Sequence, residues 1–209
     1  MNLPPRVKVV EVGPRDGLQN EALSLSVEDR VAFCRALIEA GLPVVEAGAF
    51  VSPKWVPQMA GSEEVFKALP KSPAQLPMLV PNRQGFERAR EVGVTAVAIF
   101  TAASDTFNLK NTNATIEASL ARFAEFTSEA KAGGLFIRGY VSTCFGCPYE
   151  GAVAPARVAE VAGRLMDLGC DEISLGDTIG VAVPSQMDEV IGAVTPRVDL
   201  EHLAVHMHD

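Results

Sequence analysis

The sequence predicts an α/β fold, a (β/α)8 TIM barrel that stops after its seventh strand. Apolar, β-branched runs alternate with amphipathic stretches almost from end to end of the 209 residues. Such an alternation is typical of a parallel sheet with helices covering both faces. No glycine-rich dinucleotide fingerprint follows the first run, which argues against a Rossmann fold. Strand–helix units of about 30–40 residues favour the barrel instead.

The seven predicted strands are short apolar runs, at residues 7–12, 43–47, 76–80, 96–101, 136–141, 172–175 and 203–206. The predicted helices lie between them, at residues 27–40, 63–69, 84–92, 116–132, 155–168 and 185–194. Ser26, Ser62 and Ser185 stand where N-caps are expected, and four glycines stand where helices should stop: Gly41, Gly93, Gly133 and Gly169.

We expect a single domain over residues 1–209, since no linker or low-complexity tract interrupts the pattern. The sequence ends directly after the seventh predicted strand. An open barrel of seven strands would expose the edges of its first and last strands, which proteins usually avoid. The expectation is therefore that the eighth βα unit is missing, because the natural chain continues beyond Asp209 or because this is a fragment.

The composition is that of a globular protein and argues against nucleic acids and membranes as partners. Apolar residues make up 48% and charged residues 21%, as in an ordinary globular protein, and the net charge is −8. Nucleic acids and membrane surfaces both attract basic faces, so we expect neither as a partner. The N-terminus lacks the apolar core of a signal peptide, and no run reaches the roughly 20 residues that span a bilayer. These features favour a cytoplasmic protein.

The four cysteines are Cys34, Cys144, Cys147 and Cys170. Cys144 and Cys147 have the spacing of a redox pair, but a single pair does not support a zinc knuckle. A small-residue loop after a strand is the favoured interpretation, and a redox pair is the alternative.

Polar residues gather where the predicted strands end, which is where active sites of such barrels lie. Arg15 and Asp16 follow the first strand, and His206 and His208 follow the last. Residues i and i+2 of a strand face the same way, so the two imidazoles should point together. With the Asp16 carboxylate they make a nitrogen–oxygen site suited to magnesium, manganese or zinc. Two polar residues at a frayed terminus are the alternative interpretation.

Three charged residues besides the predicted metal ligands are candidates for a role in the site. Arg15 is a permanent cation suited to holding an enolate oxygen or a substrate carboxylate, with a surface ion pair as the alternative. Glu46 lies within an apolar run, so it should be paired or functional. A pairing with Arg15 or Arg138 and a catalytic role both remain open for Glu46. Asp177 is interpreted as a support for metal ligands rather than as a ligand.

Several long segments closely resemble hydroxymethylglutaryl-CoA lyase. They are 12–20 (Val-Gly-Pro-Arg-Asp-Gly-Leu-Gln-Asn), 50–59 (Phe-Val-Ser-Pro-Lys-Trp-Val-Pro-Gln-Met), 146–151 (Gly-Cys-Pro-Tyr-Glu-Gly), 174–180 (Ser-Leu-Gly-Asp-Thr-Ile-Gly) and 204–209 (Ala-Val-His-Met-His-Asp). The likeness runs through the whole chain in order. That family belongs to the metal-dependent barrel lyases and Claisen-type synthases.

The resemblance implies cleavage of 3-hydroxy-3-methylglutaryl-CoA to acetyl-CoA and acetoacetate. The pathway served stays open between leucine degradation and another acyl-CoA route. It implies a divalent metal, Mg or Mn, with Asp16, His206 and His208 as metal ligands. Arg15 would stabilise the enolate and Glu46 would position Arg15, while Asp16 or His206 would take the hydroxyl proton.

The sequence also departs from the family pattern. The family's asparagine ligand and its glycine-rich loop with the catalytic cysteine lie beyond the seventh strand, so this catalytic loop is expected to be missing. Gly48 and Ala49 stand where the family often has a Thr-Ser pair.

An acyl-CoA substrate needs cations or amides for its phosphates. Lys54, Lys110 and Asn111 are the candidates, because they lie in predicted loops after the second and fourth strands. A homodimer is possible from the resemblance. Two alternatives to the lyase stay open: a related 2-oxo-acid aldolase or acyl-CoA synthase, and a truncated barrel fragment without turnover.

Overall fold

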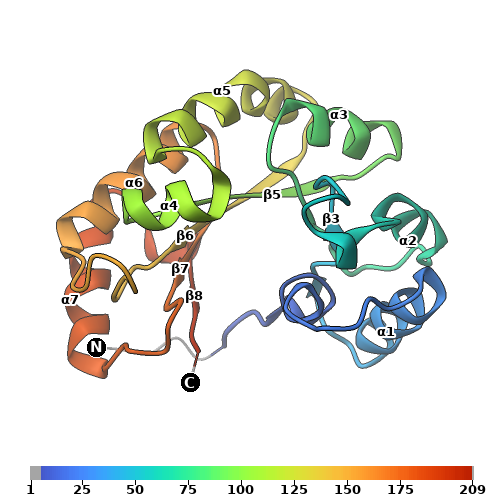
Figure 1. Cartoon of the computed structure of the whole chain (residues 1–209), viewed down its shortest axis with the longest axis horizontal. Helices are drawn as coiled ribbons and strands as arrows, with labels where there is room; N and C mark the ends of the chain where they lie inside the picture. The colour runs from blue at the N-terminus through green and yellow to red at the C-terminus, as the bar shows by residue number, and fades with distance from the viewer. Residues whose placement is uncertain (1–5, 209) are drawn as a thin grey trace. The chain divides into compact units, whose positions relative to one another are not determined.

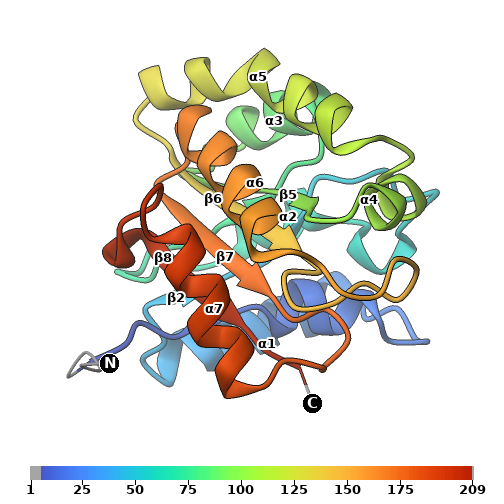
Figure 2. The same ribbon diagram turned by 90° about the vertical axis from the view of Figure 1, so that its left-hand side faces the viewer.

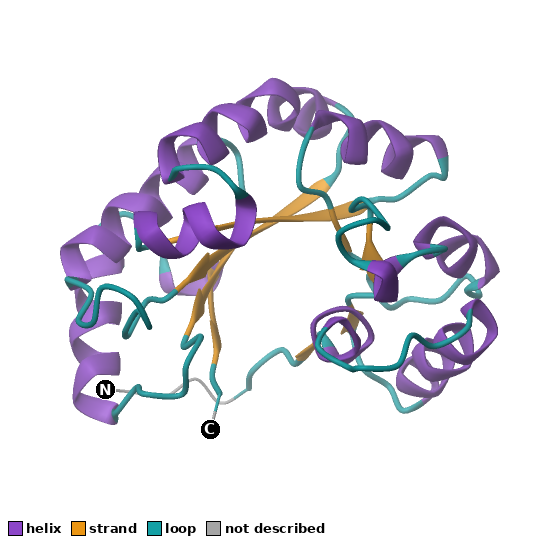
Figure 3. Ribbon diagram, in the orientation of Figure 1, coloured by secondary structure: helices purple, strands orange, loops and turns teal. Residues whose placement is uncertain are grey.

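The computed structural model describes residues 6–208 and divides the chain into two compact units, Met1–Val97 and Ala98–Asp209. Figure 1 labels the helices and most of the strands by their number in chain order, and Figure 3 shows helices and strands alternating through both units. Each unit is described by itself. One domain over residues 1–209 stays a prediction.

In the first unit, short parallel strands alternate with helices. β1 (Val10–Glu11) pairs with β2 (Val44–Val45), and β3 (Gly48–Ala49) pairs with β4 (Met78–Leu79). The helices are α1 (Val27–Glu39), α2 (Ser62–Ala68) and α3 (Arg83–Glu91), with short turns η1 (Gly13–Gly17) and η2 (Pro57–Met59).

The predicted strand 43–47 has a neighbouring segment on each side. The Glu46 amide donates to the Glu11 carbonyl at 2.8 Å, and the Ala47 amide donates to the Pro77 carbonyl at 3.2 Å. Successive amides of a strand point to opposite sides, so one continuous segment has a neighbour on each side. β2 and β3 are therefore two halves of one buried strand, and Glu46 lies between them.

The second unit holds the longer strands. They are β6 (Phe136–Ser142), β7 (Glu172–Gly176) and β8 (Leu203–His206), which pair in parallel, and β5 (Ala96–Ala102), which carries the boundary between the units. The helices are α4 (Asp105–Thr112), α5 (Ile116–Ala132), α6 (Pro155–Asp167) and α7 (Pro184–Val194), and η3 (Leu200–His202) precedes β8. Figure 2 shows α6 and α7 side by side in front of these strands.

The α/β class with a parallel sheet is confirmed. Every predicted strand overlaps an observed one, and hydrogen-bonded neighbours follow chain order, β3-β4-β5-β6-β7-β8 with β1-β2 separate. Among the described strands no ladder closes into a complete ring. No helix within residues 6–208 combines the length and apolarity needed to cross a bilayer.

Two predicted helix caps were wrong. Ser26 does cap α1, accepting the Asp29 amide at 3.1 Å, but the N-caps of α2 and α7 are Gly61 and Val183. Ser62 is instead buried and used in packing. At the end of α5, Gly133 keeps a right-handed conformation, and the left-handed residue is Gly134 with φ of 76°.

The sequence missed α4. Its residues, Asp-Thr-Phe-Asn-Leu-Lys-Asn-Thr, mostly have modest helix propensity. Tertiary contacts outweigh that weakness. Ser104 caps the helix by accepting the Phe107 amide at 3.1 Å. The buried Asn108 side chain donates to the Ala114 carbonyl and to Ser119 Oγ, both at 2.8 Å.

Arg30 is a buried cation in the first unit, only 1% exposed. Its Nη1 donates to the Ala60 carbonyl at 2.6 Å and its Nη2 to Ser62 Oγ at 3.0 Å. Burial lowers the pKa of the Arg30 guanidinium. Ser62 Oγ in turn accepts the Ala49 amide at 3.2 Å, so Arg30 ties α1 to the start of α2 and to β3.

The Arg30→Ala variant should therefore lose about 2–4 kcal/mol of unfolding free energy, because it leaves buried acceptors without a donor. Urea unfolding followed by circular dichroism measures the loss. Arg35→Ala on the same helix is the control, since Arg35 is exposed, and its change should stay within about 0.5 kcal/mol. Equal stability of the two variants would contradict the role given to Arg30.

The four cysteines are all free and buried. Cys144 and Cys147 lie in the loop after β6, as the favoured interpretation predicted, and their sulfurs have different contacts. Cys144 Sγ donates to the Val141 carbonyl at 3.0 Å, whereas Cys147 Sγ lies 3.0 Å from Ser104 Oγ. Burial raises the pKa of the Cys34 thiol to about 11, and the pKa of the Cys144 and Cys170 thiols to about 12.

Thiol reagents act on the thiolate, so Cys34, Cys144 and Cys170 should resist labelling at pH 8 in the folded protein. Peptide mapping after brief treatment with iodoacetamide should find these three unmodified, and modified once the protein is denatured in guanidinium. Labelling of Cys144 in the folded protein at the rate of a free thiol would contradict this expectation.

Candidate functional site

The segment after β1 forms a single turn that projects Arg15 and Asp16. η1 has Pro14 near its start, and the Asp16 amide donates to the Val12 carbonyl at 2.6 Å. The Glu11 carboxylate accepts the Gly13 amide at 2.6 Å and so holds the entry to the turn. The turn follows the C-terminal end of a strand, where the sequence placed the site.

Arg15 lies between two carboxylates of its own unit. Its Nε donates to Glu46 Oε1, and its Nη1 donates to Asp16 Oδ1 at 2.7 Å. Arg15 is 7% exposed and Glu46 is fully buried, whereas the Asp16 side chain keeps 27% of its surface exposed. The buried carboxylate of Glu46 therefore fixes the guanidinium, and the carboxylate of Asp16 stays partly exposed.

Glu46 takes the first of the two partners that the sequence left open. Arg138, the other candidate partner, forms an ion pair with Glu172, which stands opposite it in the parallel register of β6 and β7. Both of these residues are buried. The pairing of Glu46 with Arg15 agrees with a positioning role, which stays a prediction.

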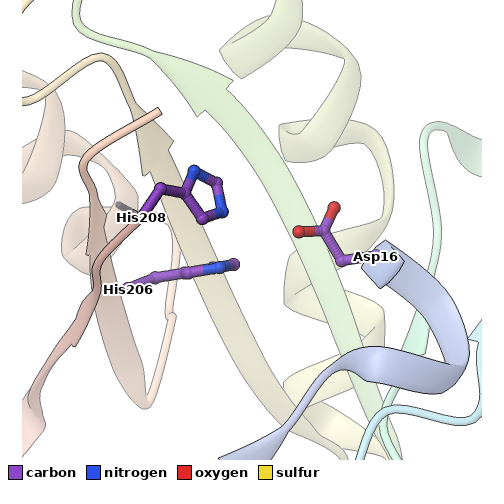
Figure 4. Close-up of side chains that lie close together, drawn as sticks. All are labelled: Asp16, His206 and His208. Carbon is purple, nitrogen blue, oxygen red and sulfur yellow. The ribbon is translucent and has the colours of Figure 1, made fainter. Parts of the chain in front are cut away.

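His206 and His208 stand at the end of β8, and their rings lie close together. The ring centroids are 4.7 Å apart at an interplanar angle of 78°. Figure 4 shows both imidazoles projecting to the same side of the chain. The i, i+2 spacing thus has the effect expected from strand geometry.

Contacts from the loop after β7 hold both histidines. The Asp177 amide donates to the His206 carbonyl at 2.8 Å, and His208 Nδ1 lies 3.3 Å from the Thr178 carbonyl. A carbonyl can only accept, so a hydrogen bond here has Nδ1 of His208 as its donor and leaves Nε2 facing away from the backbone. A metal-binding imidazole commonly has this arrangement.

Asp177 is buried and shapes this loop. Its carboxylate accepts the amides of Val181 and Ala182 at 3.1 and 2.9 Å. Thr178, the next residue, accepts the Thr143 amide at 2.7 Å through its hydroxyl. Asp177 therefore acts on the backbone that carries the histidines, which agrees with the supporting role expected from the sequence.

Asp16, in the first unit, offers a carboxylate oxygen, and His206 and His208, in the second unit, offer imidazole nitrogens. Among the described residues, no other group of three or more His, Cys, Asp or Glu side chains is a candidate to hold a metal ion. The side chains drawn in Figure 4 are the three that the sequence assigned to metal. Two imidazole nitrogens and one carboxylate oxygen suit a divalent cation of intermediate hardness.

The residues expected to contact an acyl-CoA are placed differently. Lys54 lies in an exposed turn after β3, as predicted. Lys110 and Asn111 were wrongly placed in a loop, since both belong to α4. Lys110 Nζ lies 4.9 Å from the centroid of the Tyr149 ring. Sequence reasoning passed over Tyr149, although it stands within the segment 146–151 that carried part of the resemblance.

The chain is similar to known proteins along nearly its whole length. The model of the HMGL-like family matches residues 6–209. The mitochondrial hydroxymethylglutaryl-CoA lyase of Bos taurus is 53% identical over 207 residues, which is 99% of this chain and 64% of that protein. The cytoplasmic 3-hydroxy-3-methylglutaryl-CoA lyase of Danio rerio is 51% identical over 208 residues, covering 99% of this chain and 62% of that protein. The chain thus spans under two thirds of the length of these relatives.

Solved structures of HMG-CoA lyases are similar to this chain in fold. The hydroxymethylglutaryl-CoA lyase of Pseudomonas aeruginosa superposes with a TM-score of 0.97 at 50% identity, over 100% of this chain and 70% of that one. An HMG-CoA lyase from Acinetobacter baumannii, solved with coenzyme A and 3-methylmalate, has a TM-score of 0.90 at 34% identity, over 95% of this chain and 65% of that one. Since the family model and these relatives each match nearly all of the sequence, the chain belongs to the HMGL-like family.

Proposed function

We propose that this chain carries the catalytic residues of a metal-dependent lyase that cleaves 3-hydroxy-3-methylglutaryl-CoA to acetyl-CoA and acetoacetate. The observation that carries the proposal is the Arg15 guanidinium held between Glu46 and Asp16, in a chain about half identical to hydroxymethylglutaryl-CoA lyases. Those relatives favour the lyase over a 2-oxo-acid aldolase or synthase.

The reaction sets three requirements for the site. The tertiary hydroxyl of the substrate must lose its proton, and the neighbouring carbon–carbon bond must break as the hydroxyl carbon becomes the ketone of acetoacetate. The electron pair of that bond moves into the thioester as an enolate, whose carbon then takes a proton to give acetyl-CoA. The site needs a proton acceptor, a group that orients the hydroxyl, and a cation near the thioester oxygen.

The donor set of Asp16, His206 and His208 fits a divalent cation. Its nitrogen and oxygen atoms suit Mn²⁺ or Mg²⁺, and the contact of His208 Nδ1 with the Thr178 carbonyl directs Nε2 away from the backbone. When bound, such a cation polarises a substrate oxygen and lowers the pKa of a coordinated hydroxyl. We therefore assign magnesium or manganese to these three residues.

Arg15 is suited to hold the enolate oxygen. Its charge is permanent, and little of it is exposed to water, so its interaction with a developing negative charge is weakly screened. Glu46 fixes the guanidinium before substrate binds, which avoids reorganisation during the reaction. Glu46 is accordingly a positioning residue that acts through Arg15. Asp16 and His206 are the two bases available for the hydroxyl proton.

The proposal also names an acyl-CoA as the ligand, which the coenzyme A in the related Acinetobacter structure supports. Leucine degradation, the cytoplasm and a homodimer remain predictions from the sequence. The relatives include proteins named mitochondrial and one named cytoplasmic, so they favour no single compartment.

Acetoacetate release from hydroxymethylglutaryl-CoA, first with Mn²⁺ or Mg²⁺ and then with a chelator, tests the proposal directly. Turnover that the chelator abolishes is the expected result. An absence of turnover by the 209-residue chain under both metals would refute the activity for this chain.

Removing a ligand should weaken metal binding. Losing a group that hydrogen-bonds a metal ligand costs about 10–100-fold in metal affinity, so losing a ligand itself, in Asp16→Ala or His208→Ala, should cost at least about 100-fold. Titration with Mn²⁺ by calorimetry measures the affinity. His202→Ala is the control, because His202 Nδ1 lies 2.8 Å from the Asp171 carbonyl and belongs to no described metal group. Wild-type affinity in the Asp16 and His208 variants would remove the metal from the proposal.

Removing the cation should slow the chemical step. Arg15→Gln should lower kcat by about 10²–10³-fold, as when one preorganised donor to an oxyanion is lost. Glu46→Gln should lower kcat by a smaller factor with little change in KM, because the guanidinium remains but is less firmly held. Steady-state rates at saturating metal measure both effects, and circular dichroism checks folding. A normal rate for Arg15→Gln would exclude Arg15 from the mechanism.

A further inference from the structure

A second polar and aromatic surface lies at the same end of the second unit as His206 and His208. α4 follows the C-terminal end of β5, and the loop of residues 143–154 follows the C-terminal end of β6. The Ala103 amide donates to the Ser142 carbonyl at 2.9 Å, so these two strand ends are neighbours. Figure 2 shows α4 beside this loop.

Tyr149 and Lys110 meet on this surface, and we call the pair the Tyr149–Lys110 platform. The Tyr149 side chain is 53% exposed, and Lys110 Nζ lies 4.9 Å from its ring centroid. Phe107 supports the ring at a centroid distance of 6.3 Å and an angle of 36°. Lys110 forms no ion pair with any described carboxylate. A half-exposed aromatic ring and an unpaired ammonium group thus stand together.

Both sides of the platform are held in place. The Glu150 carboxylate accepts the Thr106 amide at 2.8 Å, which joins the loop to the first turn of α4. Cys147 and Gly151 exchange backbone hydrogen bonds of 2.8 and 2.9 Å and close the loop around Tyr149. Asn108 anchors α4 from beneath. A surface ordered before binding loses less conformational entropy when a ligand arrives.

The acidic groups nearby are engaged elsewhere. Hydrogen bonds from Thr106 are the main reason why the pKa of Glu150 is lowered, and they direct its charge toward the start of α4. Asp105 accepts from Arg157 Nη2 at 3.0 Å and from the Ile116 amide at 2.9 Å. The charge of Lys110 is therefore the one that a ligand on the Tyr149 ring would meet.

We propose that the Tyr149–Lys110 platform binds the 3′-phosphoadenosine end of the acyl-CoA. The purine stacks on the Tyr149 ring, and the Lys110 ammonium exchanges its contact with the ring for a contact with a phosphate. Aromatic rings bind nucleobases by stacking, and an exposed cation–π contact is weak enough to be exchanged for a phosphate. The choice of occupant rests on the proposed function, since an acyl-CoA presents a purine and phosphates at one end and the reacting carbons at the other.

The experiment uses adenosine 3′,5′-bisphosphate as the probe, without metal, so that binding is measured apart from catalysis. Wild-type protein should bind it, Tyr149→Ala should weaken binding about 10-fold, and Tyr149→Phe should retain it. Lys110→Gln should weaken binding and reduce its dependence on salt, because one phosphate contact is lost. Lys67→Gln, an exposed lysine on α2, is the control and should bind as the wild type does.

Wild-type binding by both Tyr149→Ala and Lys110→Gln, or no binding of the probe by the wild-type protein, would overturn the proposal. Kinetics separate it from the lyase activity. Tyr149→Ala should raise KM for hydroxymethylglutaryl-CoA and leave kcat unchanged, while KM for the truncated hydroxymethylglutaryl pantetheine thioester stays the same. If neither thioester yields acetoacetate but the Tyr149 variant loses the probe, the lyase proposal fails and the nucleotide platform stands.

Discussion

The burial of Glu46 is the constraint on which the candidate site depends. This carboxylate lies inside a strand that has a neighbour on each side, and it is completely removed from solvent. A buried ionised group is costly unless a cation and hydrogen bonds compensate for the lost hydration. Arg15 supplies that compensation from the turn after β1. The same contact that makes the buried charge tolerable therefore fixes the orientation of the guanidinium.

In the second unit, backbone contacts rather than charges orient the histidines. Asp177 uses its amide for the carbonyl of His206 and its carboxylate for the amides of the following loop. The loop then presents the Thr178 carbonyl to His208. One short segment after β7 thus sets the geometry of both imidazoles. A change in that loop would therefore alter the orientation of both rings.

The two ends of the strands in the second unit carry different kinds of polar contact. Near their beginnings, Asp171 pairs with Lys131 at 2.6 Å and accepts the Ile137 amide at 2.8 Å, so its carboxylate is used for structure. Near their ends lie His206, His208 and the Tyr149–Lys110 platform, with rings and an ammonium group still accessible. This division is the one expected of parallel α/β folds, where the C-terminal ends of the strands carry the chemistry.

The sequence by itself determined the order of the elements other than α4, and it named the residues of the candidate metal site. Apolar runs and amphipathic helical patterns are local properties, and the His-x-His spacing at a strand end fixes which way two side chains point. Tertiary structure decided the rest. It selected Arg15 over Arg138 as the partner of Glu46, formed α4 around the buried amide of Asn108, and used Ser62 to bind Arg30 rather than to cap a helix. These outcomes depend on groups 6 to 32 residues apart, whose approach no local pattern encodes.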